Sequence, residues 1–436
     1  MRSLALCACL MVGLTSNAAA QTRTDKLALL LRQVFGPTGL SVNSESVLPD
    51  GSTHTAHFNS GFQSNFTQVN VAVASQITAL PLPSPASGFT YTFNTATGTF
   101  VRSTQSFGPI LTDRAETIGR GRFSFGYNAQ FFSFDTLEGV SLSSIPAVFT
   151  HDDFQLGGGR SDVVTTVNSI EASVGQMAGI LTYGVTDRLD VSIAVPIVYT
   201  RLSITSDAEV QRIGTTNDPT IHFFRDENAP GSYGTHRQFA ADGTAVGLGD
   251  LILRAKGTLL REGLRGLALG VDVRLPTGDE RDLLGAGAVG VKPFAAFSTA
   301  WGKVSPHINL AYQWNGDSVL AGDVGTGTTA KLPDQILYAV GADLGVSDRL
   351  SLAVDVFGGR IIDSPRLVPS SFVTTAGARF DDVTYRNSTF STAAGSVGLK
   401  VNISGRVLAN FNVRFKLSDA GLVDRASPLL GVEYGF

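Results

Sequence analysis

The chain has 436 residues, is 43% hydrophobic, and carries 33 basic against 37 acidic residues, for a formal net charge of −4. It contains no basic tract, so we expect no nucleic-acid partner. Its two cysteines, Cys7 and Cys9, lie within the first twenty residues, which leaves the rest of the chain without disulfides, thiol nucleophiles or thiolate metal sites.

Residues 1–20 have the pattern of a cleaved secretory signal. Arg2 supplies the positive end, residues 4–14 the apolar run, and Ala18 to Ala20 a small-residue cleavage site. The apolar run is too short to cross a membrane as a helix, and the rest of the chain has no run of about 18 apolar residues. The sequence therefore predicts a secreted chain without helical membrane spans.

Residues 21–118 precede the repeating hairpins and differ from them in pattern. Leu27, Leu30, Leu31 and Val34 recur at helical spacing, and a second helix is expected over 66–80, ending at a proline-rich stretch. A hairpin is expected over 88–104, but its arms are too short to span a bilayer. We interpret the segment as either a plug inside the lumen or a periplasmic extension, and in the plug interpretation this hairpin and its flanks would fill the lumen.

From residue 119 onward the sequence predicts an all-β fold, a transmembrane antiparallel β-barrel. Leu350, Leu352, Val354 and Val356 alternate with small or polar residues, as in a strand with one face toward lipid. Ala353 lies on the opposite face, so Ala353→Arg is expected to be milder than Val354→Arg, provided that the lumen has room. In all, the pattern predicts about twelve spanning strands: 121–135, 170–184, 189–203, 248–260, 265–275, 289–300, 304–315, 336–346, 349–359, 391–403, 406–417 and 428–436.

Connections between these strands alternate strictly between short and long. Five have two to four residues, and the other six are longer: 136–169, 204–247, 276–288, 316–335, 360–390 and 418–427. Short periplasmic turns and long external loops are typical of bacterial outer-membrane barrels. The last strand ends in Phe436, and a terminal aromatic residue resembles the signal by which such barrels are recognised by their assembly machinery. These features predict a location in the bacterial outer membrane.

If the regular apolar face meets lipid, the other face lines the interior. Its charges are mixed in sign, so they either pair across strands to hold the barrel or line a polar conduit. One such pair, Arg254 with Asp272, is expected if Leu259 pairs with Leu267. The candidate lining residues are Asp190, Asp250, Arg254, Lys256, Asp272, Arg274, Lys292, His307, Asp343, Asp355, Lys400, Asn410, Arg414 and Lys416.

No motif in the chain predicts a cofactor, a metal site or catalytic residues. The GxGxxG pattern over 285–290 precedes a strand and lacks the βαβ context of a dinucleotide site. His54 and His57 have metal-ligand spacing but no third ligand nearby, and an acidic cluster of Asp279, Glu280 and Asp282 is expected to be a solvated external loop. The chain has one candidate base, His307, but no distinctive nucleophile. We therefore expect no enzyme activity.

Several segments resemble the outer-membrane barrel family named for the meta-cleavage pathway of phenol degradation. The resemblance rests on GFTYTFNTATGTFVRSTQSFGPI, TIGRGRFSFGYN, YGVTDRLDVSIAVPIV, GLGDLILRAKGTLL, LALGVDVRLPTGDERDLLGAGAVGVKPF and SPHINLAYQW, across residues 88–360. Members are regarded as transport proteins, and the resemblance implies a barrel without catalytic residues. The Asn-Pro-Ala signature that we associate with the plug of fatty-acid carriers is absent.

The sequence favours a channel for passive uptake of small hydrophobic or aromatic compounds. A structural or surface-interaction barrel is the alternative, and an outer-membrane hydrolase the third possibility. The expected partners are outer-membrane lipid and lipopolysaccharide, the barrel-assembly machinery, and a small-molecule solute.

Overall fold

The computed structural model describes residues 26–36, 39–47, 56–60, 67–79, 91–94, 99–102, 105–151, 155, 158–226, 229 and 231–435. The expected signal over 1–20 and Phe436 lie outside these residues, as do the side chains of the hairpin over 88–104.

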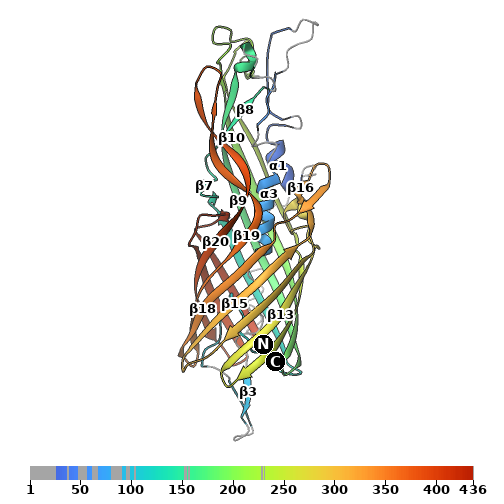
Figure 1. Cartoon of the computed structure of the whole chain (residues 1–436), viewed down its shortest axis with the longest axis vertical. Coiled ribbons are helices and arrows are strands. Elements are labelled where there is room, and N and C mark those ends of the chain that lie inside the picture. Colours follow the sequence, from blue (N-terminus) through green and yellow to red (C-terminus); the bar gives the residue numbers. More distant parts are fainter. Residues whose placement is uncertain are drawn as a thin grey trace, which may run out of the picture.

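Within the described residues, twelve antiparallel strands close into a barrel (Figure 1). Neighbouring strands follow one another along the chain, and the wall is closed where the first strand, β5, pairs with the last, β23. Closure leaves no unpaired strand edge, which a membrane interior requires. The wall strands are β5 (Phe123–Phe134), β9 (Val163–Thr186), β10 (Leu189–Gln211), β12 (Leu251–Glu262), β13 (Arg265–Leu275), β14 (Gly290–Ser298), β15 (Val304–Asn315), β18 (Gln335–Ser347), β19 (Leu350–Val373), β20 (Arg379–Asn402), β21 (Val407–Lys416) and β23 (Ala426–Gly435).

The twelve predicted strands are confirmed, but four of them are much longer than predicted. β9, β19 and β20 have 24 residues each and β10 has 23. A strand rises about 3.3 Å per residue, so these strands continue well beyond a bilayer into stretches predicted as loops. Pairing sustains them, since β19 stays paired with β20 as far as Val373 and Arg379, and the outer half of β10 pairs with β11 (His236–Leu248).

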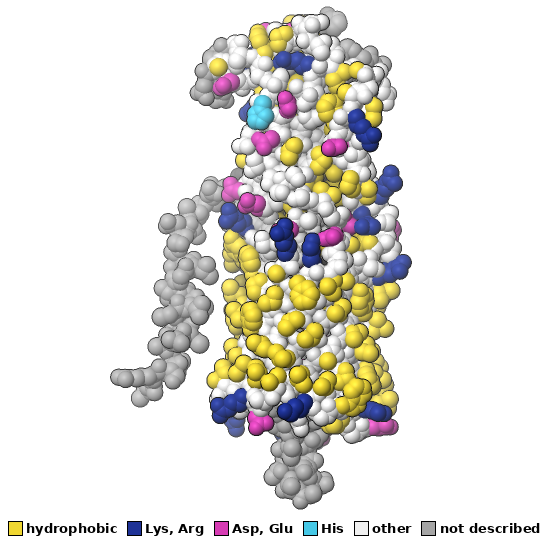
Figure 2. Space-filling view, turned by 90° about the vertical axis from the view of Figure 1, so that its left-hand side faces the viewer, with side chains coloured by type: hydrophobic (Ala, Val, Ile, Leu, Met, Phe, Trp, Pro, Cys, Tyr) yellow, Lys and Arg dark blue, Asp and Glu magenta, His cyan; other side chains and the backbone are white. Residues whose placement is uncertain are grey.

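Side chains alternate across the wall as predicted. Val354 and Val356 are 51% and 45% exposed on the outside, while Ala353 and Asp355 are 2% and 1% exposed on the inside. Figure 2 shows the outward hydrophobic side chains as a band across the lower half of the visible face, with Lys and Arg at both edges. This band has the form expected of a surface in contact with lipid.

The long-loop end of the barrel carries a separate apolar core. α1 (Leu27–Gln33) and α3 (Thr67–Ala79) confirm the two predicted helices, and the Nδ2 of Asn70 joins them by a 3.0 Å hydrogen bond to the carbonyl of Ala28. Leu27 and Ala74 are fully buried in a cluster that includes residues of β9 and β10. No described helix is both long enough and apolar enough to cross a membrane.

The remaining elements are short and lie outside the wall. Figure 1 shows β3 projecting below the barrel at the short-turn end, so the hairpin part of the expected plug lies outside the lumen, while the flank that follows it, residues 105–118, contacts inward-facing wall residues. These elements are β1 (Ser41–Val42), β2 (Ala56–His57), β3 (Tyr91–Asn94), β4 (Thr99–Arg102), β6 (Thr136–Leu137), β7 (Val140–Ser141), β8 (Ile145–Thr150), β16 (Asp317–Asp323), β17 (Thr328–Lys331), β22 (Leu422–Val423), η2 (Gly158–Ser161) and η3 (Glu280–Asp282).

Candidate functional site: the barrel lumen

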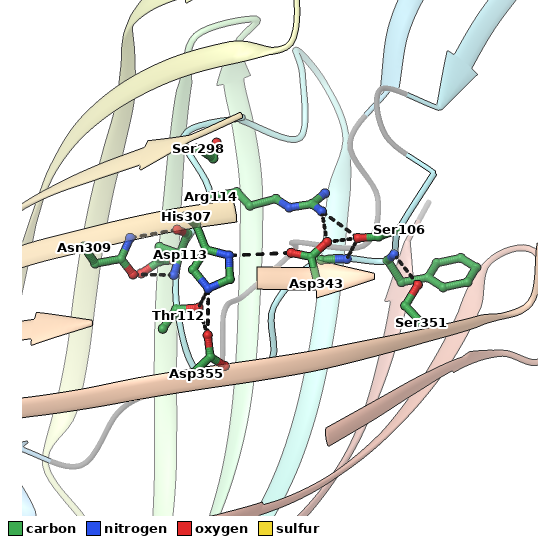
Figure 3. Close-up of polar contacts among 12 residues, drawn as sticks. Ser106, Thr112, Asp113, Arg114, Ser298, His307, Asn309, Asp343, Ser351 and Asp355 are labelled. Atoms are coloured by element: carbon green, nitrogen blue, oxygen red, sulfur yellow. Dashed lines mark hydrogen bonds and ion pairs between the residues drawn. The ribbon is translucent and has the colours of Figure 1, made fainter. Parts of the chain in front are cut away.

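Residues 105–118, here called the lumen segment, cross the inside of the barrel (Figure 3). The segment enters beside β18 and β19, where the Oγ of Ser351 accepts a 2.8 Å hydrogen bond from the backbone N–H of Phe107. Arg114 reaches back to this side, with its Nη2 2.5 Å from the Oδ2 of Asp343 and 2.7 Å from the Oγ of Ser106. Ser106 also donates to Asp343. The pair is closed off from solvent, because the Arg114 and Asp343 side chains are 2% and 0% exposed.

The middle of the lumen segment contacts a buried histidine on β15. The Nε2 of His307 lies 2.8 Å from the Oγ1 of Thr112 and 2.7 Å from the Oδ1 of Asp355, and its Nδ1 lies 3.6 Å from the Oδ1 of Asp343. Thr112 also donates to Asp355 over 3.1 Å. The imidazole therefore joins two wall strands to the segment.

Asp113 of the lumen segment binds a charged cluster on β12, β13 and β14, the strands that follow β15 around the wall. Its carboxylate accepts hydrogen bonds from the Nη1 of Arg254 at 2.9 and 3.2 Å. The same guanidinium binds Asp272 through Nε at 2.6 Å and Nη2 at 2.8 Å, and Lys292 lies 3.0 Å from Asp272. Asn309 holds the backbone of Asp113, accepting from its N–H at 2.7 Å and donating to its carbonyl at 2.8 Å.

The lumen segment then returns to the short-turn end beside β10, β12 and β14. The backbone N–H of Ala115 donates to the Oγ of Ser298 at 3.0 Å, and its carbonyl accepts from the Oγ1 of Thr258 at 2.6 Å. The N–H of Ile118 donates to the carboxylate of Asp190 at 3.0 Å. With both ends and its middle bound to the wall, the segment forms an arch across the lumen.

Two adjoining cavities lie beside this arch. The inner cavity, about 110 Å³, lies between the lumen segment and the wall near Phe294. The outer cavity, about 70 Å³, lies under α3 near Arg414. The linings of both cavities include Leu337, Phe357 and Gly358, so the two are neighbours along the barrel axis.

The structure places the fourteen candidate lining residues in or next to the wall strands. The pair expected from sequence is present, since Arg254 lies opposite Asp272, although a register shift makes Leu260, not Leu259, the partner of Leu267. Lys416 differs from the rest because it binds Asp419 in the next connection, at 2.6 Å. Ten side chains are buried, namely Asp190, Asp250, Arg254, Asp272, Arg274, His307, Asp343, Asp355, Lys400 and Asn410, while Lys256, Lys292, Arg414 and Lys416 are partly exposed.

Most of these charges are used in contacts inside the barrel. Lys400 forms a 2.8 Å ion pair with Glu433, and the Nζ of Lys256 donates to the carbonyl of Arg114 at 3.1 Å. Arg274 lies 3.6 Å from Asp250, as part of a buried pair. The lining therefore binds the lumen segment as well as itself.

Sequence reasoning missed Thr112, Asp113 and Arg114 as functional residues. The available signal was a short polar run, residues 112–114, between the apolar residues Ile110 and Leu111 on one side and Ala115 on the other, of which Ile110 and Ala115 are almost fully buried. Such a run is too short to show strand or helix periodicity.

The acidic cluster in the connection after β13 has a structural role instead of being a free external loop. The Nζ of Lys26 lies 2.8 Å from both Asp279 and Asp282, and the N–H of Leu27 donates to Asp282 at 3.3 Å. Burial opposes ionisation of Asp279, but the hydrogen bonds and charge of Lys26 outweigh it and hold the pKa below its usual value. The expectation of a merely solvated cluster is wrong, because these carboxylates bind the start of α1.

The GxGxxG stretch also serves packing. The backbone N–H of Ala286 donates to Asp250 at 2.8 Å, and a Cβ at Gly285 would collide with the same carboxylate. Among the described residues, no group of three or more His, Cys, Asp or Glu is arranged to hold a metal ion. The side chains of His54 and His57 lie outside the described part of the chain.

Another buried carboxylate, Asp162, binds a loop at the far long-loop end. It accepts hydrogen bonds from the backbone N–H groups of Ile213 and Gly214, both at 2.8 Å, and from the hydroxyl of Thr215. The Nδ1 of His222 lies 2.7 Å from its Oδ2. Burial acts to raise the pKa of Asp162, but these hydrogen bonds together lower it below its usual value.

Comparison with known proteins places this barrel in a family. Residues 146–365 match the family described as "Putative MetA-pathway of phenol degradation", and the chain belongs to that family. The resemblance seen in the sequence is thus confirmed. None of the curated proteins compared with the chain matches it.

Solved structures of outer-membrane channels share the barrel architecture only distantly. An outer membrane channel from Pseudomonas putida F1 is 16% identical, with a TM-score of 0.47, over 74% of this chain and 99% of that one. A FadL homologue from Pseudomonas aeruginosa is 8% identical, with a TM-score of 0.31, over 72% of this chain and 89% of that one. Likenesses at this level carry no functional argument.

Proposed function

We propose that the protein is a passive outer-membrane channel that takes up small hydrophobic or aromatic compounds and is closed at rest by the lumen segment. The observation that carries this proposal is the arch of residues 105–118 beside two adjoining cavities inside a closed, lipid-facing barrel. A twelve-stranded barrel has a narrow interior, so a single crossing segment is enough to obstruct it. Passage then requires the segment to move.

The cavities support the solute class. Phe294 and Phe357 contribute aromatic surface, and the arch supplies Leu111. Apolar walls with a few polar groups favour small molecules that carry a ring or a short hydrocarbon. The lipid-facing band supports outer-membrane lipid and lipopolysaccharide as the surroundings, and we propose the assembly machinery as the partner during insertion.

A disulfide between the arch and the wall tests the proposal. A Cβ at Gly266 would lie 2.9 Å from the Cβ of Ala115, so a small shift brings cysteines at both positions into the range of a disulfide. No cysteine lies beyond residue 9, so an introduced pair has no competitor in the barrel. Liposomes with the oxidised Ala115→Cys/Gly266→Cys variant should swell slowly in a panel of small solutes, and reduction should restore the wild-type rate.

Each single cysteine variant is the matched control, since neither can form the bond. Equal swelling of the oxidised and reduced double variant would contradict a moving segment. No solute flux in any form would favour the structural or surface-interaction barrel instead. Ester cleavage by the intact protein would favour the hydrolase, for which the contact between Thr112 and His307 is the nearest arrangement of hydroxyl and base.

A further inference from the structure

The inner cavity combines an aromatic surface with fixed positive charge. The guanidinium of Arg254 lies over the ring of Phe294, 4.9 Å from its centroid, and Lys292 is in the same lining. Phe357 lines the same cavity from β19. At about 110 Å³, the cavity is comparable with the roughly 150 Å³ apolar cavity that holds benzene.

The charges around this cavity do not balance within the wall itself. Arg254 and Lys292 both bind one wall carboxylate, Asp272. A second carboxylate comes from the lumen segment, where Asp113 binds the Nη1 of Arg254. These two cations and the single wall carboxylate leave one positive charge, which Asp113 neutralises when the arch is in place.

We propose that the inner cavity is a binding site for a small aromatic monocarboxylate, whose carboxylate takes the place of Asp113 on Arg254. The ring then occupies the space between Phe294 and Phe357. One carboxylate replaces another, so the charge of the site is unchanged and no cation is left buried without a partner. A neutral aromatic compound cannot make this exchange. The inference rests on the proposed channel function, because the ligand must reach the lumen.

Binding of this kind would also release the arch. Asp113 is one of the side chains that hold the lumen segment to the wall, so a ligand on Arg254 competes with closure. Asn309 binds only the backbone of residue 113, through two hydrogen bonds. The exchange of carboxylates on Arg254 therefore does not require these two hydrogen bonds to break. The ligand thus acts both as cargo and as the signal for opening.

Calorimetric titration of the full-length protein in detergent tests this site directly. The probes are benzoate and benzyl alcohol, which share a ring but differ in charge. We expect benzoate to bind and benzyl alcohol to bind at least tenfold more weakly, since a hydrogen bond to a charged group contributes on that order. Asp113→Asn should tighten benzoate about tenfold or more by the same reasoning, with benzyl alcohol unchanged.

Two further variants distinguish competition between benzoate and Asp113 for Arg254 from a general loosening of the lumen segment. Glu116→Gln removes a carboxylate from the same segment, but its amide oxygen can still accept the 3.0 Å hydrogen bond from Ser298, so benzoate affinity should not change. Ala339→Leu fills the cavity without altering charge and should abolish benzoate binding.

Equal affinities for the two probes would overturn the proposal. So would tightening of both probes by Asp113→Asn, which would mean only that the arch had loosened. Benzoate binding without flux in liposomes would support this binding site and contradict the channel function. Flux of neutral solutes without benzoate binding would support the channel function and contradict this binding site.

Discussion

Replacing Arg114 with methionine should open the barrel without unfolding it. The substitution keeps a long apolar side chain but leaves the carboxylate of Asp343, which is 0% exposed, without its arginine. Breaking a buried ion pair from one side costs up to about 3–5 kcal/mol, because the charge left behind loses its partner. Among the described residues, the ion-pair partner that Asp343 keeps is the more distant imidazole of His307, whose Nδ1 lies 3.6 Å away. This cost falls on docking of the lumen segment, since Arg114 belongs to the segment and Asp343 to β18. The hydrogen bonds of the wall are untouched.

A cost of that size shifts the closed–open equilibrium on the order of a hundred- to several-thousandfold toward the open state. Single-channel conductance in planar bilayers should therefore show long open periods in Arg114→Met, where the wild-type protein opens rarely. Heat-modifiable migration on gels, which reports a folded barrel, should remain as in the wild type. Protease added from the short-turn side should cut the lumen segment of the variant faster.

The double variant Arg114→Met/Asp343→Asn is the control for buried charge. The asparagine still accepts from Ser106, but no ion is left unpaired, so closure should largely return. The reasoning is refuted if Arg114→Met stays as closed and as protected as the wild type. It is also refuted if the double variant opens as readily as the single one.

Two further predictions concern the wall and the long-loop end. Val354→Arg places a charge on the lipid face and should cost roughly 2–4 kcal/mol in folding titrations, with flux unchanged and Val354→Leu close to neutral. Ala353→Arg should instead raise flux, because Ala353 packs against Ile110 of the lumen segment, and equal phenotypes for the two arginines would mean that the facing is misassigned. At the long-loop end, the lowered pKa of Asp162 means that its stabilising effect is present above the usual carboxyl value of 3.8 and is lost as pH falls through the lower folded value. Hydrogen exchange at Ile213, corrected for the intrinsic rate, should stay slow down to that pH and speed up below it, whereas Asp162→Asn should exchange faster at neutral pH as well.

The condition under which Ala353→Arg was expected to be mild, free space in the lumen, is not met. Alternation placed this residue correctly on the inner face, where it is 2% exposed. Its neighbours there are Ile110, Leu111 and Leu429, which fill the space that the sequence suggested was open. Periodicity gives the direction of a side chain but not what has packed against it.

The wall of the barrel could be predicted from the sequence alone. Strand alternation is a local property with a period of two, so residues such as Val354 and Asp355 reveal their faces from their immediate neighbours. Hairpin neighbours could also be inferred, because a short turn fixes which strands meet, and Arg254 opposite Asp272 followed from that. The number of strands follows from the same alternation, whereas the family was identified from the resemblance of whole segments to its members.

How the lumen is closed became visible only in the folded barrel. Asp113 and Arg254 are 141 residues apart, and Lys26 and Asp282 are 256 apart, with no repeating pattern that connects either pair. The lumen segment forms neither helix nor strand, so nothing in its own sequence fixes its course. Its position results from buried charges on the wall that need partners, and those partners become apparent only when all twelve strands have brought the charges to one interior.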